Sequence, residues 1–245
     1  MARKAIAVIP ARYQSSRFPG KPLADICGKP MIWWVYNQVK KVKAFDEIVI
    51  ATDDDRIAKV CGNYDMNFLL TSKGHNTPTS RIYEVSNKIS SDLYVFIGGD
   101  EPLIDAKAIR KVVFQARENN EEVTHAMTKI KTAPEVIDFT NIKVVVSQEN
   151  YLLYTTRSPL PFPKGELDFD YMKFVGIGAF TKAALDFYNT TPKSKLERIE
   201  ECDLLRFLEG RVPVKMVEVS CRSLSVDTPK DLDAVISIIE KGNYI

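Results

Sequence analysis

The stretch AIAVIPARYQSSRFPGKPL, residues 5–23, joins an apolar run to a polar loop. Residues 5–9 are all apolar, which is typical of a strand buried on both faces of a parallel sheet. We expect Pro10 to end this strand, because proline lacks the N–H group that a central strand donates. Three cations follow in the loop: Arg12, Arg17 and Lys21. The sequence thus predicts a rigid strand that leads into a cationic loop.

A loop at the carboxyl end of the first parallel strand is where open α/β sheets bind ligands. Arg side chains bind phosphate oxygens through two hydrogen bonds, and Lys adds a point charge. The loop therefore predicts a triphosphate site, although cations at this spacing can also simply be solvated on a surface loop. It is neither a GxxxxGK[ST] loop nor a GxGxxG loop, which excludes two common phosphate-binding motifs.

Composition limits the other classes of function. The chain has 245 residues, 45% of them hydrophobic, and a formal net charge of +2, which argues against a broad nucleic-acid footprint. The four cysteines form no CxxC pair and lie far from both histidines, so neither a zinc site nor a redox dithiol is indicated. The apolar start is too short for a signal peptide, and no run of about eighteen apolar residues occurs. We expect a cytoplasmic protein with free thiols and no membrane insertion.

Strands and helices alternate along the first half of the chain. Apolar runs and helical spacing predict a helix at 31–43, strands at 47–51, 67–70 and 93–97, and a helix at 105–118. The adjacent acids 53–55 resemble a metal cluster, but we expect Thr52 or one of these acids to cap a helix that starts near Arg56. We also expect Thr79 to cap the next helix. This alternation predicts a doubly wound α/β sheet.

Two glycines and an acid follow the strand predicted at 93–97. Gly98 and Gly99 allow the backbone to approach a ligand closely. Asp100 lies at the carboxyl end of this strand, beside the cationic loop if both strands are central in the sheet. A carboxylate there can bind Mg²⁺ that bridges phosphate oxygens.

Several stretches together resemble one family. IPARYQSSRFPGKPL (9–23), GKPMI (28–32), GDEP (99–102) and VDTPKDL (226–232) are similar to the signatures of the sugar-acid cytidylyltransferases, above all the 3-deoxy-manno-octulosonate (Kdo) cytidylyltransferases. The resemblance runs over nearly the whole chain. It implies a Rossmann-like α/β nucleotidyltransferase fold with a mixed, mainly parallel sheet, as a single domain over residues 1–245. It also implies a β-rich lobe at about 123–177 that covers the sugar and forms a homodimer, and the sequence itself predicts several strands there without long helices.

The activity implied is transfer of CMP from CTP to the anomeric hydroxyl of a sugar acid, with release of pyrophosphate. The catalytic residues would be Arg12, Lys21, Asp100 and Asp227, and the two acids would hold Mg²⁺. Without the resemblance, Asp227 reads as a turn residue before a helix capped by Thr228. The nucleotide would be bound by a larger set: Pro10, Ala11, Arg12, Ser15, Arg17, Lys21, Thr79, Arg81 and Gly99. Thr79 and Arg81 match a family signature whose glycine and acid are replaced here by Pro78 and Ser80.

The sugar site implied by the resemblance is less complete. Its residues would be Arg157 for the sugar carboxylate, with Lys164, Phe174, Glu200 and Asp203. The family has polar residues where this chain has Gly98, Phe174 and Leu204, and a lost hydrogen bond to a buried hydroxyl costs about 1–3 kcal/mol. These changes favour a different acceptor. Two alternatives therefore stay open: a nucleotidyltransferase of the same fold for another acceptor, and a nucleotide-binding protein without catalysis.

Overall fold

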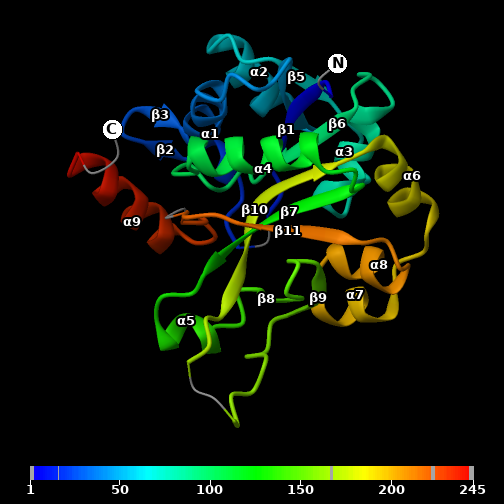
Figure 1. Cartoon of the computed structure of the whole chain (residues 1–245). Coiled ribbons are helices and arrows are strands. Elements are labelled where there is room, and N and C mark those ends of the chain that lie inside the picture. The colour runs from blue at the N-terminus through cyan, green and yellow to red at the C-terminus, as the bar shows by residue number, and fades with distance from the viewer. Residues whose placement is uncertain (1–2, 16, 166–167, 222–223, 243–245) are drawn as a thin grey trace.

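The computed structural model describes residues 3–15, 17–165, 168–221 and 224–242. Within this part of the chain, nine strands form one sheet and two short strands form a hairpin. The main path of the sheet has the order β11-β7-β10-β6-β1-β4-β5. Figure 1 shows this sheet running through the molecule with helices on both sides and a smaller part projecting from it. The mixed, mainly parallel α/β fold predicted from the sequence is confirmed.

The parallel half of the sheet is the part that the apolar runs predict. It contains β1 (Ala5–Ala11), β4 (Glu47–Thr52), β5 (Phe68–Leu70) and β6 (Leu93–Ile97). β1 lies between β4 and β6 and runs parallel to both. Alternate residues of β1 enter two different cores, because successive side chains of a strand point to opposite faces.

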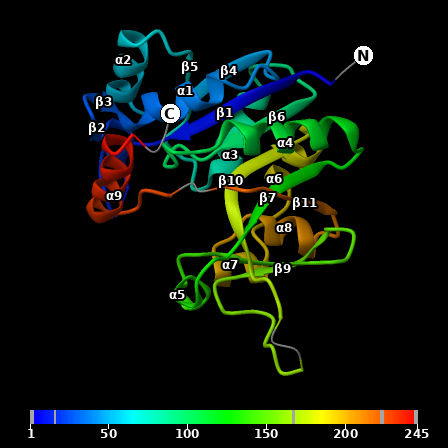
Figure 2. The same ribbon diagram turned by 60° about the vertical axis from the view of Figure 1, so that its left-hand side comes forward.

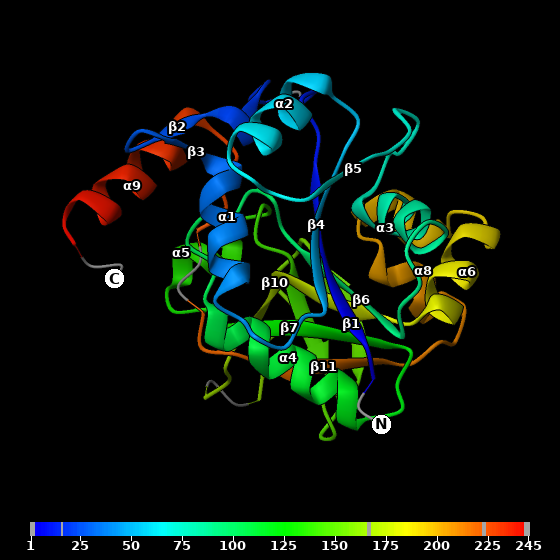
Figure 3. The ribbon, with the colours of Figure 1, turned by 90° about the horizontal axis from the view of Figure 1, so that it is seen from above.

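Helices cover both faces of this half. Ala7 and Ile9 pack with α1 (Met31–Lys40), α2 (Asp55–Asn63) and α4 (Ala106–Glu118). Ile6 and Val8 pack with α3 (Pro78–Ser86), α6 (Lys182–Thr190) and α8 (Leu204–Glu209). Figure 3 shows α1 on one side of β1 and the second group on the other. No helix of the described part is long and apolar enough to span a bilayer.

The prediction that Pro10 ends β1 is wrong. The strand continues to Ala11, and Pro10 is paired in register with Ala51 of β4. On its other side the pairing with β6 stops at Val8. β1 therefore has a single neighbour at Pro10, and a proline is tolerated in a strand where one side is an edge.

The second half of the sheet contains β7 (Val123–Lys129), β10 (Met172–Phe180) and β11 (Val214–Glu218). β10 is antiparallel to both β6 and β7, whereas β11 is parallel to β7. The remaining strands, β8 (Lys143–Val146) and β9 (Leu152–Thr156), extend the sheet from β10. The short helix α5 (Ala133–Ile137) lies between β7 and β8 in the chain. Figure 1 shows α5, β8 and β9 on the projecting part, and Figure 2 shows α5 and β9 there from another side. The β-rich stretch predicted at 123–177 is thus divided, with its first and last strands in the central sheet.

The last elements return to the central sheet and then to the cationic loop. α7 (Lys195–Glu200) ends before Glu201, which has a positive φ of 52°, and α8 follows three residues later at Leu204. α9 (Pro229–Glu240) packs near the hairpin of β2 (Asp25–Ile26) and β3 (Lys29–Pro30), as Figure 3 shows, and the short 3₁₀ helix η1 (Lys21–Leu23) precedes this hairpin. The segment that leads into α9 thereby lies against the loop that follows β1.

Most helix starts follow their sequence signals. The side chains of Asp54, Asp105 and Thr228 each accept a hydrogen bond from a backbone N–H in the first turn of α2, α4 and α9. The predicted cap of α3 at Thr79 is wrong. Thr77 caps this helix instead, because its hydroxyl accepts the N–H of Ser80 and Pro78 occupies the first turn, where an N–H is not needed.

Candidate active site

Three segments that are far apart in sequence meet at one charged cluster. The amine of Lys21 lies 2.9 Å from Oδ2 of Asp100 and 3.3 Å from Oδ1 of Asp227. The guanidinium of Arg17 lies 3.1 Å from the same oxygen of Asp227. The exposed fraction is 13% for the side chain of Lys21, 36% for Asp100 and 32% for Asp227. The cluster is therefore half-buried and still open to a ligand.

The loop that carries Lys21 is held by a glycine turn. Gly20 has a φ of 73°, and its N–H donates to the carbonyl of Tyr13 at 2.8 Å. A Cβ at this position would lie 3.1 Å from the ring of Tyr13, so both the backbone angle and the space favour glycine. The guanidinium of Arg56 stacks on the same ring, 3.2 Å from its centroid.

The two acids are fixed by backbone contacts around them. The N–H of Val226 donates to the carbonyl of Asp100 at 2.9 Å, which joins the two segments directly. The N–H groups of Asp227 and Thr228 both donate to Asp231 in the first turn of α9. Asp227 thus stands at the entrance of a capped helix, and its own carboxylate is left to face Lys21 and Arg17.

Gly99 brings the turn after β6 against β1. A Cβ built on it would lie 2.5 Å from the carbonyl oxygen of Pro10, so a larger residue would separate the two strand ends. Ala11 is buried at the end of β1. Ser15 accepts the N–H of Phe18 at 3.4 Å, which shapes the loop.

Arg12 and Arg17 are the exposed cations of this loop. Arg12 has no hydrogen-bond or ion-pair partner among the residues that the structure describes. Both guanidinium groups can therefore bind an anion that approaches from solvent.

Thr79 and Arg81 make internal contacts instead. Arg81 is 3% exposed, lies 2.8 Å from the carboxylate of Asp53 and donates to the hydroxyl of Thr71. Thr79 donates to Asp203 at 2.7 Å. Two predicted site residues from different groups thus bind each other, and burial raises the pKa of Asp203. Contact of Thr79 or Arg81 with a nucleotide stays a prediction.

Arg157 and Glu200 form a second cluster at the end of β9. The carboxylate of Glu200 accepts the N–H of Arg157 at 2.9 Å and the hydroxyl of Thr156 at 2.6 Å. The guanidinium of Arg157 donates to the carbonyls of Glu200 and Phe139 at 2.9 and 3.0 Å. No side-chain carboxylate within the described ranges pairs with this guanidinium, so it remains available for an acidic ligand. Lys164 is exposed and its side chain joins neither cluster.

Phe174 is stacked on a buried histidine that sequence reasoning missed. The ring centroids of Phe174 and His125 are 4.2 Å apart, at an interplanar angle of 28°. His125 is 1% exposed, and burial lowers its pKa to about 4. One sign in the sequence indicates that His125 is buried, which is its position within the strand pattern of β7.

Two other buried polar residues, Lys143 and Glu101, were given no role from the sequence, for a similar reason. Lys143 is fully buried, and its amine donates to the carbonyls of Asp138 and Asn141 at 2.8 and 2.7 Å. Burial lowers the pKa of this amine. Glu101 follows Asp100 directly, and its carboxylate accepts the N–H of Gly176 in β10. The only signals were a lysine in an apolar strand and an acid beside Asp100.

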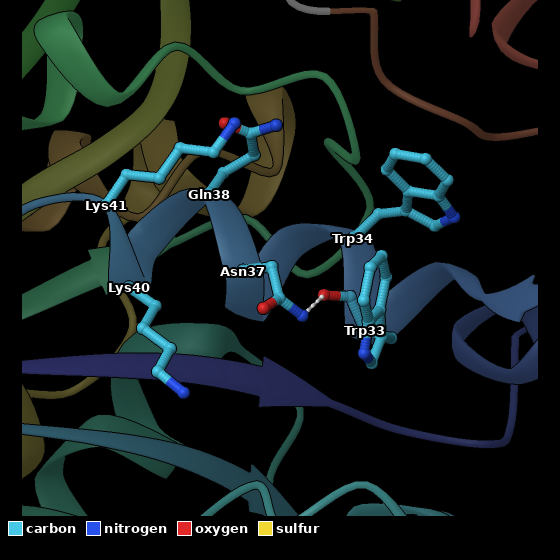
Figure 4. Close-up of a pocket in the computed structure, with 6 residues that line it drawn as sticks. All are labelled: Trp33, Trp34, Asn37, Gln38, Lys40 and Lys41. Carbon is cyan, nitrogen blue, oxygen red and sulfur yellow. Dashed lines mark hydrogen bonds between the residues drawn. The ribbon is translucent and has the colours of Figure 1, made fainter. Parts of the chain in front are cut away.

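A groove on α1 is separate from both clusters. It is lined by Trp33, Trp34, Asn37, Gln38, Lys40 and Lys41. Figure 4 shows these side chains along one helix, with the amide of Asn37 donating to the carbonyl of Trp33 at 2.8 Å. None of these residues belongs to the predicted site.

The fold and the charged cluster define a class of protein. A parallel sheet whose central strand ends carry a cationic loop and two carboxylates is the architecture of a nucleotidyltransferase, since ligands bind beyond the carboxyl ends of such strands.

Comparisons with known proteins narrow this class. The sequence model of the family described as Cytidylyltransferase matches residues 6–240. The 3-deoxy-manno-octulosonate cytidylyltransferase of Escherichia coli is 35% identical over 236 residues, 96% of each chain. That of Syntrophotalea carbinolica is 39% identical over 240 residues, which cover 92% of this chain and 94% of the relative. The structure of a CMP:2-keto-3-deoxy-manno-octonic acid synthetase complexed with CTP superposes with a TM-score of 0.93 at 35% identity, over 98% of this chain and 99% of that one. The chain therefore belongs to the cytidylyltransferase family.

Proposed function

We propose that this enzyme transfers CMP from CTP to the anomeric hydroxyl of a sugar acid of the Kdo class. The hydroxyl oxygen forms a bond to the α-phosphorus, the bond between that phosphorus and the bridging oxygen breaks, and pyrophosphate leaves. The hydroxyl proton passes to solvent. The single observation that carries the proposal is that Lys21 joins Asp100 and Asp227 at the strand ends of a cytidylyltransferase fold. The names of the relatives support both the nucleotide and the acceptor class.

Mg²⁺ is the metal that fits these residues. The carboxylates of Asp100 and Asp227 converge on one amine, so their oxygens already surround the position of a cation. Mg²⁺ prefers such oxygen ligands and usually completes its shell with phosphate oxygens and water. This suits the site, because the described residues contain no group of three or more His, Cys, Asp or Glu that could hold a metal alone. When bound, the ion would polarise the α-phosphate and neutralise developing charge.

The cationic loop would bind the triphosphate. Lys21, which is nearly buried, would contact phosphate oxygens at close range, and the exposed Arg12 and Arg17 would add bidentate hydrogen bonds. Ser15 and the backbone at Pro10, Ala11 and Gly99 would line the same space. Charge neutralisation of this kind lowers the barrier to attack on a polyanion.

The acceptor would be held by its carboxylate. Arg157 supports this role, because its guanidinium is fixed by two backbone carbonyls and keeps further N–H groups for a ligand. Glu200 would orient Arg157 through the backbone N–H that it binds. Phe174, Lys164 and Asp203 are proposed to complete the sugar side.

A different acceptor of the same chemical class is the second candidate. Gly98 has no side chain, Phe174 stacks on His125, and Leu204 is buried in the core. No side chain at these three positions can hydrogen-bond a sugar hydroxyl, which favours an acceptor with fewer hydroxyl groups on that side.

A panel of acceptors tests both candidates. Each sugar acid is incubated with CTP and Mg²⁺, and pyrophosphate release is measured. Efficient turnover of Kdo would remove the second candidate. Binding of CTP without pyrophosphate from any sugar acid would instead favour a nucleotide-binding protein without catalysis. Asp100→Asn and Asp227→Asn should abolish turnover while the circular dichroism spectrum is kept, and a normal rate in either would reject the metal site.

We also propose that the enzyme is a cytoplasmic homodimer. Large apolar side chains on the projecting part, among them Phe139 and Phe162, are exposed in the single chain. Burial of such a patch against a second copy would remove it from water. Light scattering of the wild type and of Phe162→Asp tests this, and a wild type that is monomeric at micromolar concentration would contradict it.

A further inference from the structure

Glu101 is a buried acid directly beside the charged cluster. Its residue is 9% exposed, although carboxylates are rarely buried without a partner. Its Oε1 accepts the N–H of Gly176 at 2.9 Å. Gly176 lies 75 residues after Glu101 and belongs to β10, which is the neighbour of β6 in the sheet.

Two glycines make room for this carboxylate. The N–H of Gly98 donates to the carbonyl of Gly176 at 2.8 Å, so the two backbones lie against each other. A Cβ on Gly176 would overlap Oε1 of Glu101, with no space for both. A Cβ on Gly98 would lie 3.2 Å from Oδ1 of Asp100 and 3.2 Å from Oε1 of Glu101. The carboxylates of Asp100 and Glu101 therefore border the same small volume.

The contact falls where β10 is irregular. The register between β10 and β7 shifts between Phe174 and Gly178, so Gly176 lies within the irregular stretch. Such bulges disrupt the ladder and redirect a strand locally. Here the N–H of Gly176 binds a side chain from the turn after β6, and this bond joins the turn to β10.

We propose that Glu101 is a positioning residue for Asp100. By binding Gly176, it fixes the turn at 98–101 to β10 and so holds the carboxylate of Asp100 opposite Lys21 and Asp227. The inference rests on the proposed function, in which Asp100 is a Mg²⁺ ligand. Groups that orient a metal ligand without touching the ion typically change metal affinity or activity by about 10- to 100-fold when they are removed.

The contact can be broken from either side. Glu101→Ala removes the acceptor, and Gly176→Ala places a methyl group where Oε1 lies. Glu101→Gln keeps an oxygen that accepts the N–H of Gly176. Gly178→Ala is the matched control on the same strand, because its Cβ would lie 2.5 Å from the ring of His125 and leave Glu101 untouched.

The first readout is the affinity of the enzyme–CTP complex for Mn²⁺, measured by electron paramagnetic resonance without acceptor. Glu101→Ala and Gly176→Ala should each weaken it by about tenfold or more, whereas Glu101→Gln should restore most of it. Gly178→Ala should leave it unchanged. The Mg²⁺ concentration for half-maximal pyrophosphate release should shift in the same order.

A double variant tests whether both substitutions act on one contact. Glu101→Ala with Gly176→Ala should be no weaker in Mn²⁺ affinity than Glu101→Ala alone, because changes to a shared contact are not additive. The inference is overturned if Glu101→Ala keeps wild-type Mn²⁺ affinity while the wild type turns over and Asp100→Asn does not. Failure of the proposed function is a different result, in which the wild type itself releases no pyrophosphate with CTP. Because Glu101→Ala introduces no clash, it decides the question even if Gly176→Ala fails to fold.

Discussion

Removal of the Lys21 charge is the most direct perturbation of the site. Lys21→Met keeps the length of the side chain and deletes the amine that lies 2.9 Å from Asp100 and 3.3 Å from Asp227. A hydrogen bond to a charged group contributes about 1.5–3 kcal/mol, and the amine would make such a bond to the triphosphate. Since about 1.4 kcal/mol corresponds to tenfold in rate, kcat/KM for CTP should fall by about ten- to 150-fold.

The ligand-free protein should respond as well. Without the amine, the nearest cation is the guanidinium of Arg17, which lies 3.1 Å from Asp227 and forms no ion pair with Asp100 among the described residues. Both carboxylates are about one-third exposed, so solvent screens their repulsion and we expect a loss of about 1 kcal/mol in the free energy of unfolding. Mg²⁺ should restore this loss, because it supplies a positive charge at the same place.

Pyrophosphate release under steady-state conditions measures the first effect, and thermal unfolding in EDTA and in Mg²⁺ measures the second. Lys107→Met is the control, because Lys107 is exposed on α4 and its side chain has no partner among the described residues. A folded Lys21→Met variant that keeps kcat/KM within about twofold of the wild type would contradict this role of the amine. An equal rise in melting temperature with Mg²⁺ for Lys21→Met and for Lys107→Met would also contradict it.

Four further substitutions should have distinct results. Arg206→Met leaves the fully buried Glu197 without its ion pair, and urea unfolding should show a loss of about 3–5 kcal/mol. Burial lowers the pKa of His125 to about 4, below its unfolded value of about 6.5, so only the unfolded state gains this proton between these two pH values. Stability should therefore fall as pH drops from 6.5 to 4, and His125→Leu should remove this part of the pH dependence in urea titrations. Gly99→Ala forces its Cβ to within 2.5 Å of a backbone carbonyl of β1 and should reduce both activity and melting temperature. Gly62→Ala in α2, where a Cβ meets nothing within 4 Å, should instead raise stability by about 0.5–1 kcal/mol.

Local signals in the sequence predicted the framework well. The apolar run before the cationic loop forms the central strand, and Asp105 and Thr228 cap the helices that their positions indicated. These features depend on neighbouring residues alone, so the sequence contains all the information they need. Two local predictions were wrong, the end of β1 at Pro10 and the helix cap at Thr79. Pro10 stays in the strand because its partner on one side is missing, and that depends on where β6 ends.

Part of the site could not be predicted because it depends on contacts across the fold. Arg81 matched a family signature, yet its guanidinium is paired with Asp53, which the sequence indicated as part of a helix start. His125 lies beneath Phe174 only because β7 and β10 are adjacent. No local pattern specifies either neighbour. Burial of a polar side chain becomes visible only when the strand order is known.

The two acids of the cluster differ in how they are held. Asp227 stands before a helix whose capping box is formed within five residues, so its position is set locally. Asp100 follows a short strand and two glycines, which allow many backbone conformations, and its turn must be fixed from outside. Backbone hydrogen bonds from Val226 and to Gly176 supply part of this fixation. Glu101 adds the side-chain contact, because its carboxylate reaches β10, the strand that also carries Phe174. Removal of Glu101 should therefore disturb Asp100 much more than Asp227, and the geometry of the carboxylate pair depends on the strand that runs antiparallel to its neighbours.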